Sequence, residues 1–235
     1  MESLVAGIAR ARELVDLRRH EGVHPRVGAA DVVPLVPIRP GDMERAKAAA
    51  LALGEKIAEE LGLPVFLYGE VGAGRRPAFF RRGGSETLQA RVDSGELAPD
   101  FGPSRLDPAA GAVLVGARTP LVAFNVDLAT DDVEVARAIA TTVRESSGGF
   151  PGVQALGLRL SDRTQVSMNL LDTSRTRLHE VIAHVVAEAA ARGIEVQGSE
   201  LVGLLPASVA VDAAAGPLRL AGLDESRILE LRLLD

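Results

Sequence analysis

The chain has 235 residues, 47% of them hydrophobic and 25% charged, which suits a globular protein of one or two domains with a sizeable core. Its formal net charge of −6 argues against a nucleic-acid-binding surface, and the absence of Cys excludes disulfides, thiolate metal sites and cysteine nucleophiles. We find no apolar run long enough to span a membrane and no signal peptide, so we expect a cytoplasmic protein with neither membrane nor nucleic-acid partners.

The first half of the chain is predicted to alternate helices with short strands. Its first helix, over residues 2–19, is amphipathic with a period of 3.6 residues. Pro34 and Pro37 mark the strand that follows as an edge strand or a bent one. After the first helix we expect a strand over 30–38, a helix over 42–61, a strand over 65–68, an irregular and functional connection over 69–111, and a strand over 112–117.

The second half is predicted to contain a complete β-α-β-β-α-β order, which is that of the split βαβ, or ferredoxin-like, unit. Residues 121–128 are apolar almost throughout, which predicts a strand buried on both faces. The other expected elements are strands over 153–160 and 165–171 and from 194, and helices over 131–145 and 176–192. The fold class is therefore predicted to be α+β.

The two halves predict two subdomains, residues 1–117 and 118–235. The first half has only an α-β-α-β order, so a duplicated ferredoxin-like unit would be incomplete there at its N-terminus.

The loop over residues 18–28 holds two of the four histidines, flanked by arginines, with Pro25 and Gly28 as turn formers. Histidine has an unperturbed pKa near neutrality, which suits proton transfer. We predict that His24 carries out this chemistry. The alternative is a structural, hydrogen-bonding role for the histidines of this loop.

Two further motifs look like binding sites but do not have the spacing that such sites require. His179 and His184 are five residues apart and so face different sides of a helix, whereas two metal ligands on one face need a spacing of four. We therefore expect surface histidines and no metal site. The glycine-rich run over 69–76 fits neither the dinucleotide fingerprint nor the P-loop, which favours a mobile loop.

Arginines are concentrated in and just after the irregular connection. A guanidinium group can bind a carboxylate through two parallel hydrogen bonds, so an arginine-lined cleft would suit an anionic ligand. A solvated surface is the alternative. These arginines are Arg75, Arg76, Arg81, Arg82, Arg105 and Arg118.

The sequence resembles the formiminotransferase domain of glutamate formimidoyltransferases and formimidoyltransferase-cyclodeaminases. The resemblance centres on the His24-Pro25-Arg26 motif and extends from the first helix to the C-terminal region. The matching stretches occur in the same order along the chain, at residues 22–34, 63–70, 99–103, 111–112, 116–118, 123–126, 165–170 and 198–206.

The resemblance implies a reaction and a set of site residues. The family transfers the formimino group from N-formimino-L-glutamate to N5 of tetrahydrofolate, a co-substrate, in histidine breakdown, and no metal takes part. Its active-site histidine falls on His24 as the general acid and base. Its folate contacts fall on one turn and on one loop that is shorter here, namely Gly102, Pro103, Ser104, Arg105, Leu106, Asp107, Pro108, Ala109, Ala110 and Gly111, and Gly148, Gly149 and Phe150.

The resemblance also implies how the substrates are held. Both carry glutamate carboxylates, so arginines such as Arg81 or Arg105 are expected to bind them and fix their approach. The family has two α/β subdomains with the ligands between them, and it forms a homodimer.

The chain departs from the family pattern in two places. Val23 stands where an acidic residue is common. Family members also open with a strand, a helix and two further strands before the helix that begins this chain, so we expect a truncated reading frame or a short form. Two other functions remain open, a relative acting on 5-formyltetrahydrofolate and a non-catalytic folate-binding remnant.

Overall fold

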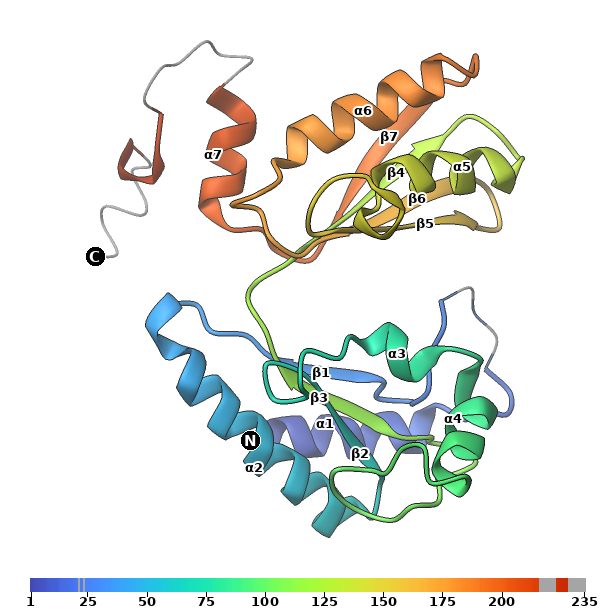
Figure 1. Ribbon diagram of the computed structural model, residues 1–235, viewed down its shortest axis with the longest axis vertical. Coiled ribbons are helices and arrows are strands. Elements are labelled where there is room, and N and C mark those ends of the chain that lie inside the picture. The colour runs from blue at the N-terminus through green and yellow to red at the C-terminus, as the bar shows by residue number, and fades with distance from the viewer. Residues whose placement is uncertain (21, 23, 216–222, 228–235) are drawn as a thin grey trace. The chain divides into compact units, whose positions relative to one another are not determined.

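The computed structural model describes residues 1–20, 22, 24–215 and 223–227, which form an α+β protein with two sheets (Figure 1). The chain divides into two compact units, Met1–Thr119 and Pro120–Asp235. Val23 and the parts of the predicted second subdomain at 216–222 and 228–235 lie outside the described residues. No helix in the described part is both long and apolar enough to cross a membrane.

The first unit contains a parallel three-stranded sheet. Its strands β1 (Val32–Leu35), β2 (Val65–Gly69) and β3 (Val113–Ala117) lie in the order β1-β3-β2. Helices follow β1 and β2, so the chain crosses back to the same end of the sheet before each following strand begins. This parallel pairing differs from the antiparallel pairing of the split βαβ unit that we predicted for this half.

Helices cover both faces of this sheet. Helices α1 (Glu2–Leu14) and α2 (Met43–Leu61) pack on one face, and α3 (Pro77–Arg81) and α4 (Gly84–Asp93) pack on the other. The buried side chains include Ile8, Leu53, Ile57, Val65 and Val115 on the first face and Phe66, Phe80, Leu88 and Leu114 on the second. The middle strand β3 is buried throughout, so it anchors the unit.

The second unit contains an antiparallel four-stranded sheet in the order β5-β6-β4-β7, and its element order is the predicted β-α-β-β-α-β. Two helices pack on one face of the sheet and enclose the core. Its elements are β4 (Val122–Leu128), α5 (Val133–Val143), β5 (Val153–Arg159), β6 (Thr164–Leu170), α6 (Leu178–Ala190) and β7 (Val196–Val202).

The short elements are η1 (Pro40–Asp42), η2 (Glu145–Ser147) and η3 (Glu225–Arg227), and a further helix, α7 (Ala207–Ala215), follows β7. Helix α1 ends five residues before the predicted boundary at 19. Val15 adopts an extended conformation there, and the N–H of Leu17 donates to the Ala109 carbonyl at 2.8 Å, so the chain leaves the helix to pack along another segment.

Two predictions about the connections and strands are wrong. The connection over 69–111 is not irregular throughout, because it contains α3 and α4. The expected strand buried on both faces, β4, is buried on one face only. Val122, Val126 and Leu128 are buried, whereas the residues between them are part-exposed. An antiparallel sheet can pack one face on the core and leave the other open to solvent.

Candidate functional site

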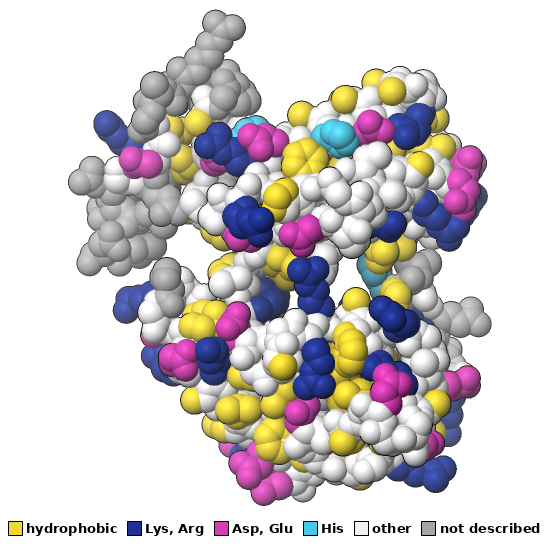
Figure 2. Space-filling model, in the orientation of Figure 1, with side chains coloured by type: hydrophobic (Ala, Val, Ile, Leu, Met, Phe, Trp, Pro, Cys, Tyr) yellow, Lys and Arg dark blue, Asp and Glu magenta, His cyan; other side chains and the backbone are white. Residues whose placement is uncertain are grey.

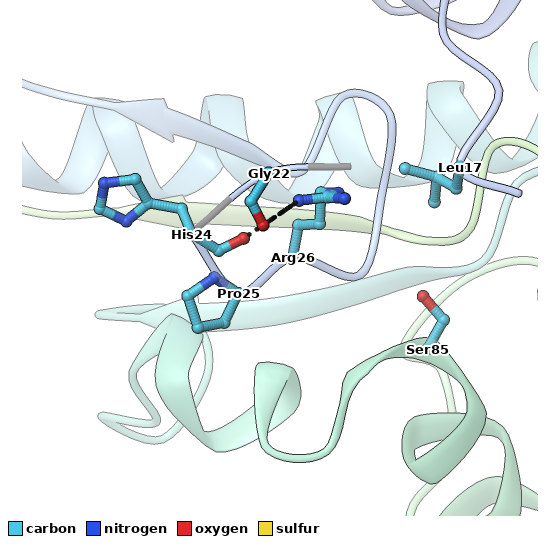
Figure 3. Close-up of a pocket in the computed structure, with 6 residues that line it drawn as sticks. All are labelled: Leu17, Gly22, His24, Pro25, Arg26 and Ser85. Carbon is cyan, nitrogen blue, oxygen red and sulfur yellow. Dashed lines mark hydrogen bonds between the residues drawn. The ribbon is translucent and has the colours of Figure 1, made fainter. Parts of the chain in front are cut away.

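His24 lies on the surface of the first unit, in the loop between α1 and β1. A cavity of about 360 Å³ adjoins this loop and is lined by Leu17, Gly22, His24, Pro25, Arg26 and Ser85. Figure 3 shows the imidazole of His24 pointing away from Arg26 and Ser85. The ring is exposed and makes no hydrogen bond or ion pair among the described residues, so it is available to a ligand.

Arg26 shapes the N-terminal side of this loop. Its Nη1 donates to the carbonyl oxygens of Gly22 at 3.3 Å and His24 at 3.2 Å (Figure 3). Its Nη2 donates to the carbonyl of His20. The planar guanidinium fork can satisfy several fixed acceptors at once. Arg26 is therefore occupied by backbone carbonyls of the loop that carries His24.

Asp31 shapes the C-terminal side of the loop. Its Oδ1 accepts the N–H groups of Val27 at 2.6 Å and Gly28 at 2.9 Å. Its Oδ2 accepts from Nε of Arg81 at 2.7 Å and also pairs with Nη2 of the same side chain. Arg81, one of the two arginines that were expected to bind a substrate carboxylate, thus binds a carboxylate of the protein itself.

The predicted folate turn lies directly against the histidine loop. The N–H of Ala112 donates to the Val27 carbonyl at 2.9 Å, and the N–H of Ala29 donates to the Ala110 carbonyl at 2.8 Å. A Cβ on Gly28 would lie 1.9 Å from the Ala112 carbonyl oxygen, so this approach requires glycine. The structure therefore brings together two segments that are about eighty residues apart in the sequence.

Asp107 organises the end of this turn. Its Oδ1 accepts the N–H groups of Ala109 at 2.8 Å and Ala110 at 2.9 Å, and its Oδ2 accepts from Nη2 of Arg12 at 3.2 Å. Burial alone would raise the pKa of this carboxyl group, but the hydrogen bonds from Ala110 and Ala109 and the charge of Arg12 outweigh it and lower the pKa. Asp107 thus serves as an ionised structural residue.

The start of the turn is held by α4. The Oε1 of Gln89 accepts the N–H of Leu106 at 2.7 Å, and its Nε2 donates to the Ser104 carbonyl at 3.3 Å. Leu106, Ala110 and Gly111 are buried, and Asp107 and Ala109 are part-exposed. The predicted contacts that are open to solvent are Gly102, Pro103, Ser104, Arg105 and Pro108.

The other predicted folate loop lies in the second unit, where α5 ends. The N–H of Phe150 donates to the Val143 carbonyl at 2.9 Å, and that of Gly149 donates to the Arg144 carbonyl at 3.1 Å. The ring of Phe150 packs edge-on to that of His184, with 5.4 Å between their centroids. Phe150 is therefore a packing residue in this structure, and Gly148 is the exposed member of the three.

The two histidines of α6 were expected at the surface, but both are part-buried. Nε2 of His184 lies 3.1 Å from Oγ1 of Thr142, and Nδ1 of His179 lies 3.5 Å from Oδ2 of Asp212. The described residues contain no group of three or more His, Cys, Asp or Glu that could hold a metal ion.

The remaining arginines of the predicted cluster have different surroundings. The guanidinium of Arg75 stacks near the rings of Phe79 and Phe80, and Arg118 donates to the Thr119 carbonyl. Arg82 and Arg105 are exposed to solvent. Figure 2 shows basic and acidic side chains interspersed over the visible face of each unit.

Sequence reasoning missed two polar residues near this site. Asp31 follows the His-Pro-Arg motif closely, but its link to Arg81 joins residues fifty apart in the sequence. Tyr68 on β2 is buried, and this burial raises the pKa of its hydroxyl group against the opposing charges of Arg118 and Arg81. A second cavity, of about 520 Å³, lies between the end of β1 and the start of α2 and includes none of the predicted site residues.

Fold and site together define an α+β protein with a histidine-bearing loop held against a polar turn. The chain matches the N-terminal subdomain of the formiminotransferase domain over residues 1–118 and the formiminotransferase domain over residues 123–221. The chain therefore belongs to the formiminotransferase family.

Several curated proteins are similar along most of this chain. A glutamate formimidoyltransferase of Thermoplasma acidophilum is 39% identical over 99% of this chain and 79% of its own length. One of Streptococcus pyogenes is 39% identical over 95% of this chain and 77% of its own length. The formimidoyltransferase-cyclodeaminase of Sus scrofa is 44% identical over 92% of this chain, which spans 42% of that longer protein.

Proposed function

We propose that this protein is a glutamate formimidoyltransferase that transfers the formimino group from N-formimino-L-glutamate to N5 of tetrahydrofolate in histidine breakdown. Similarity to glutamate formimidoyltransferases over nearly the whole chain supports formiminotransferase activity. Tetrahydrofolate is the co-substrate that this family implies. The homodimer and the cytoplasmic location remain predictions.

One structural observation supports the assignment of particular residues to this reaction. The loop that presents His24 and the turn proposed to contact folate are joined by main-chain hydrogen bonds at Val27–Ala112 and Ala29–Ala110. A proton-transfer group and a folate-contacting segment must lie near each other in such a transferase. Their adjacency supports His24 as the general acid and base.

The chemistry needs two proton movements around one carbon. N5 of tetrahydrofolate attacks the formimino carbon, and its bond to that carbon forms while the C=N π electrons move to nitrogen. His24 takes the proton from N5 and returns it to the glutamate nitrogen as the carbon–nitrogen bond to glutamate breaks. The products are glutamate and 5-formiminotetrahydrofolate, so atoms and charge balance.

We assign the folate contacts to the segment 102–111 of the first unit and to Gly148, Gly149 and Phe150 of the second. Within the segment, the exposed residues Ser104 and Arg105 are the ones open to a ligand. Arg105 is the better candidate than Arg81 for a glutamate carboxylate, because Arg81 already pairs with Asp31. The two units correspond in this proposal to the formiminotransferase subdomains 1–117 and 118–235.

The test is turnover by the purified chain with N-formimino-L-glutamate and tetrahydrofolate, compared with 5-formyltetrahydrofolate as the alternative substrate. We expect His24→Ala to lower kcat at least about a hundredfold, the usual scale for losing general acid–base catalysis, with folate binding retained. His179→Ala, in the second unit, is the control.

Full activity of His24→Ala would contradict the role of His24. Turnover of 5-formyltetrahydrofolate alone would favour the first alternative function. Folate binding without turnover of either substrate would favour a non-catalytic folate-binding protein.

A further inference from the structure

We propose that Asp31 is a positioning residue for His24, and that Arg81 holds Asp31 in the required orientation. This inference rests on the proposed function and deepens it, since it concerns how the proton-transfer side chain is held. Asp31 makes no hydrogen bond or ion pair with the His24 ring among the described residues, and it is not itself assigned a chemical step.

The two oxygens of the Asp31 carboxylate have different partners. Oδ1 accepts two consecutive loop N–H groups, those of Val27 and Gly28, and Oδ2 accepts from Arg81 on α3. The Asp31 side chain is 17% exposed and that of Arg81 is 30% exposed. Charge-assisted hydrogen bonds of this kind are stronger and more directional than neutral ones.

The loop needs such a clamp because it has no regular structure of its own. Arg26 binds carbonyl groups on the N-terminal side of the loop, including that of His24 itself. Asp31 binds N–H groups on the C-terminal side, so His24 lies between two clamps of opposite polarity. Pro25 has a fixed φ, so few backbone torsions can rotate between His24 and the residues that Asp31 binds.

The Asp31 clamp adjoins the contact between the loop and the proposed folate turn, while the turn has its own supports in Asp107 and Gln89. Val27 is buried, and its carbonyl accepts the Ala112 N–H while its own N–H donates to Asp31. Losing the carboxylate would leave two N–H groups of this segment without an acceptor and would free Arg81. Displacements of about 1 Å in a catalytic group can cost on the order of a hundredfold in rate.

A positioning role and a merely structural role predict different kinetics. A residue that only stabilises the fold lowers the amount of active protein without changing the KM of the remaining fraction or the surroundings of His24. A residue that orients His24 lowers kcat of the folded protein and leaves KM nearly unchanged, because ground-state binding does not depend on the proton-transfer group.

The experiment uses the full chain and four variants: Asp31→Ala, Asp31→Asn, Arg81→Gln and Glu96→Ala. Glu96→Ala is the matched control, because Oε1 of Glu96 pairs with Nε of Arg91 at 2.8 Å in the same unit, and this pair has no hydrogen bond to the described residues of the histidine loop. The readouts are kcat and KM per folded molecule, the NMR signals of the His24 ring, and amide exchange at Val27 and Gly28.

We expect Asp31→Ala to lower kcat by about a hundredfold, with KM changed by less than about threefold. Asp31→Asn keeps one acceptor oxygen for the loop N–H groups, so its kcat should be roughly tenfold higher than that of Asp31→Ala. Arg81→Gln should lower kcat by about tenfold. In all three variants the His24 ring signals shift and the two amides exchange faster, whereas Glu96→Ala changes none of these readouts.

Unchanged kcat and ring signals in Asp31→Ala would overturn the proposal. If Asp31→Ala does not fold, unchanged readouts in Asp31→Asn and Arg81→Gln would overturn it in the same way. Failure of the proposed function is distinguishable: the unsubstituted chain would then lack formimino transfer, while the ring signals and the amide exchange would still decide whether Asp31 positions His24.

Discussion

Asp107 shows at the scale of one residue how a carboxylate can build a turn. Its pKa lies below the reference value of 3.8, because the N–H groups of Ala110 and Ala109 and the charge of Arg12 outweigh the effect of burial. The folded-state pKa is thus lower than the unfolded one. The carboxylate therefore stabilises the fold at pH values above the unfolded pKa, and this contribution disappears as the pH falls through the folded pKa.

We predict that acidification from about pH 5 to below 3.8 increases amide exchange at Ala109 and Ala110, relative to intrinsic rates. In Asp107→Asn, the amides of Ala109 and Ala110 should exchange faster at neutral pH, and most of the pH dependence of this exchange should disappear. Asp172→Asn is the control, because the pKa of Asp172 is also lowered, chiefly by the hydrogen bond from Ser174. Equal pH dependence in Asp107→Asn and the unsubstituted protein would contradict the role of Asp107.

Residue-scale reasoning from the sequence could select His24 as a candidate residue, but not the contacts that support its loop. The His24-Pro25-Arg26 motif is local, so both the histidine and the bend of its loop are visible in the sequence. The supports depend on contacts across the fold, such as Arg81 with Asp31 and Gln89 with the N–H of Leu106. Nothing in the spacing of these residues predicts that they meet.

At the scale of elements, two glycines illustrate opposite packing demands. A Cβ on Gly7, inside α1, would have no atom within 4 Å apart from the neighbouring backbone of its own helix, whereas a Cβ on Gly157 of β5 would lie 2.2 Å from the backbone nitrogen of Arg137 on α5. Glycine inside a helix costs about 0.5–1 kcal/mol relative to Ala. The close approach of α5 to β5, by contrast, requires a residue without a side chain at position 157.

We predict that Gly7→Ala raises the free energy of unfolding by about 0.5–1 kcal/mol, and that Gly157→Ala lowers it by about 1–3 kcal/mol. Urea denaturation followed by circular dichroism measures both. The same substitution thus has opposite signs in the two elements. A gain of stability in Gly157→Ala would show that α5 can move away from β5 at little cost.

Element predictions succeeded where periodicity and caps are strong. Gly62, which has a φ of 63°, caps the C-terminus of α2, and Asp132, whose carboxylate accepts the Glu134 N–H, caps the N-terminus of α5. They failed for α3 and α4, which are short: α3 begins at Pro77 and ends just before Gly83, and α4 begins at Gly84, and these residues are typical of loops. The parallel pairing of the first sheet was also missed, since pairing partners are not encoded in strand periodicity.

At the scale of the whole molecule, each unit has its own core. Two of the buried clusters draw all their residues from the first unit, and the third draws all of its residues from the second. Ile57 on α2 and Ile139 on α5 are fully buried representatives of the two cores. Each core can therefore be weakened separately.

We predict that Ile57→Val and Ile139→Val each lower stability by about 1 kcal/mol, and that the loss is confined to the substituted unit. Native-state amide exchange measures this through the most protected amides of β3 for the first unit and β6 for the second. Either variant serves as the control for the other. An equal loss of protection in both units from one substitution would mean that they unfold as a single cooperative body.

Ser85 is a suitable position for a fluorescent label that reports ligand binding in the cavity beside the histidine loop. Its part-buried side chain lines that cavity, and the chain contains no Cys. Ser85→Cys would therefore introduce the sole thiol, to which an environment-sensitive fluorophore can be attached selectively. Its emission would follow the arrival and departure of a ligand in real time, with no turnover required and no competing label elsewhere in the protein.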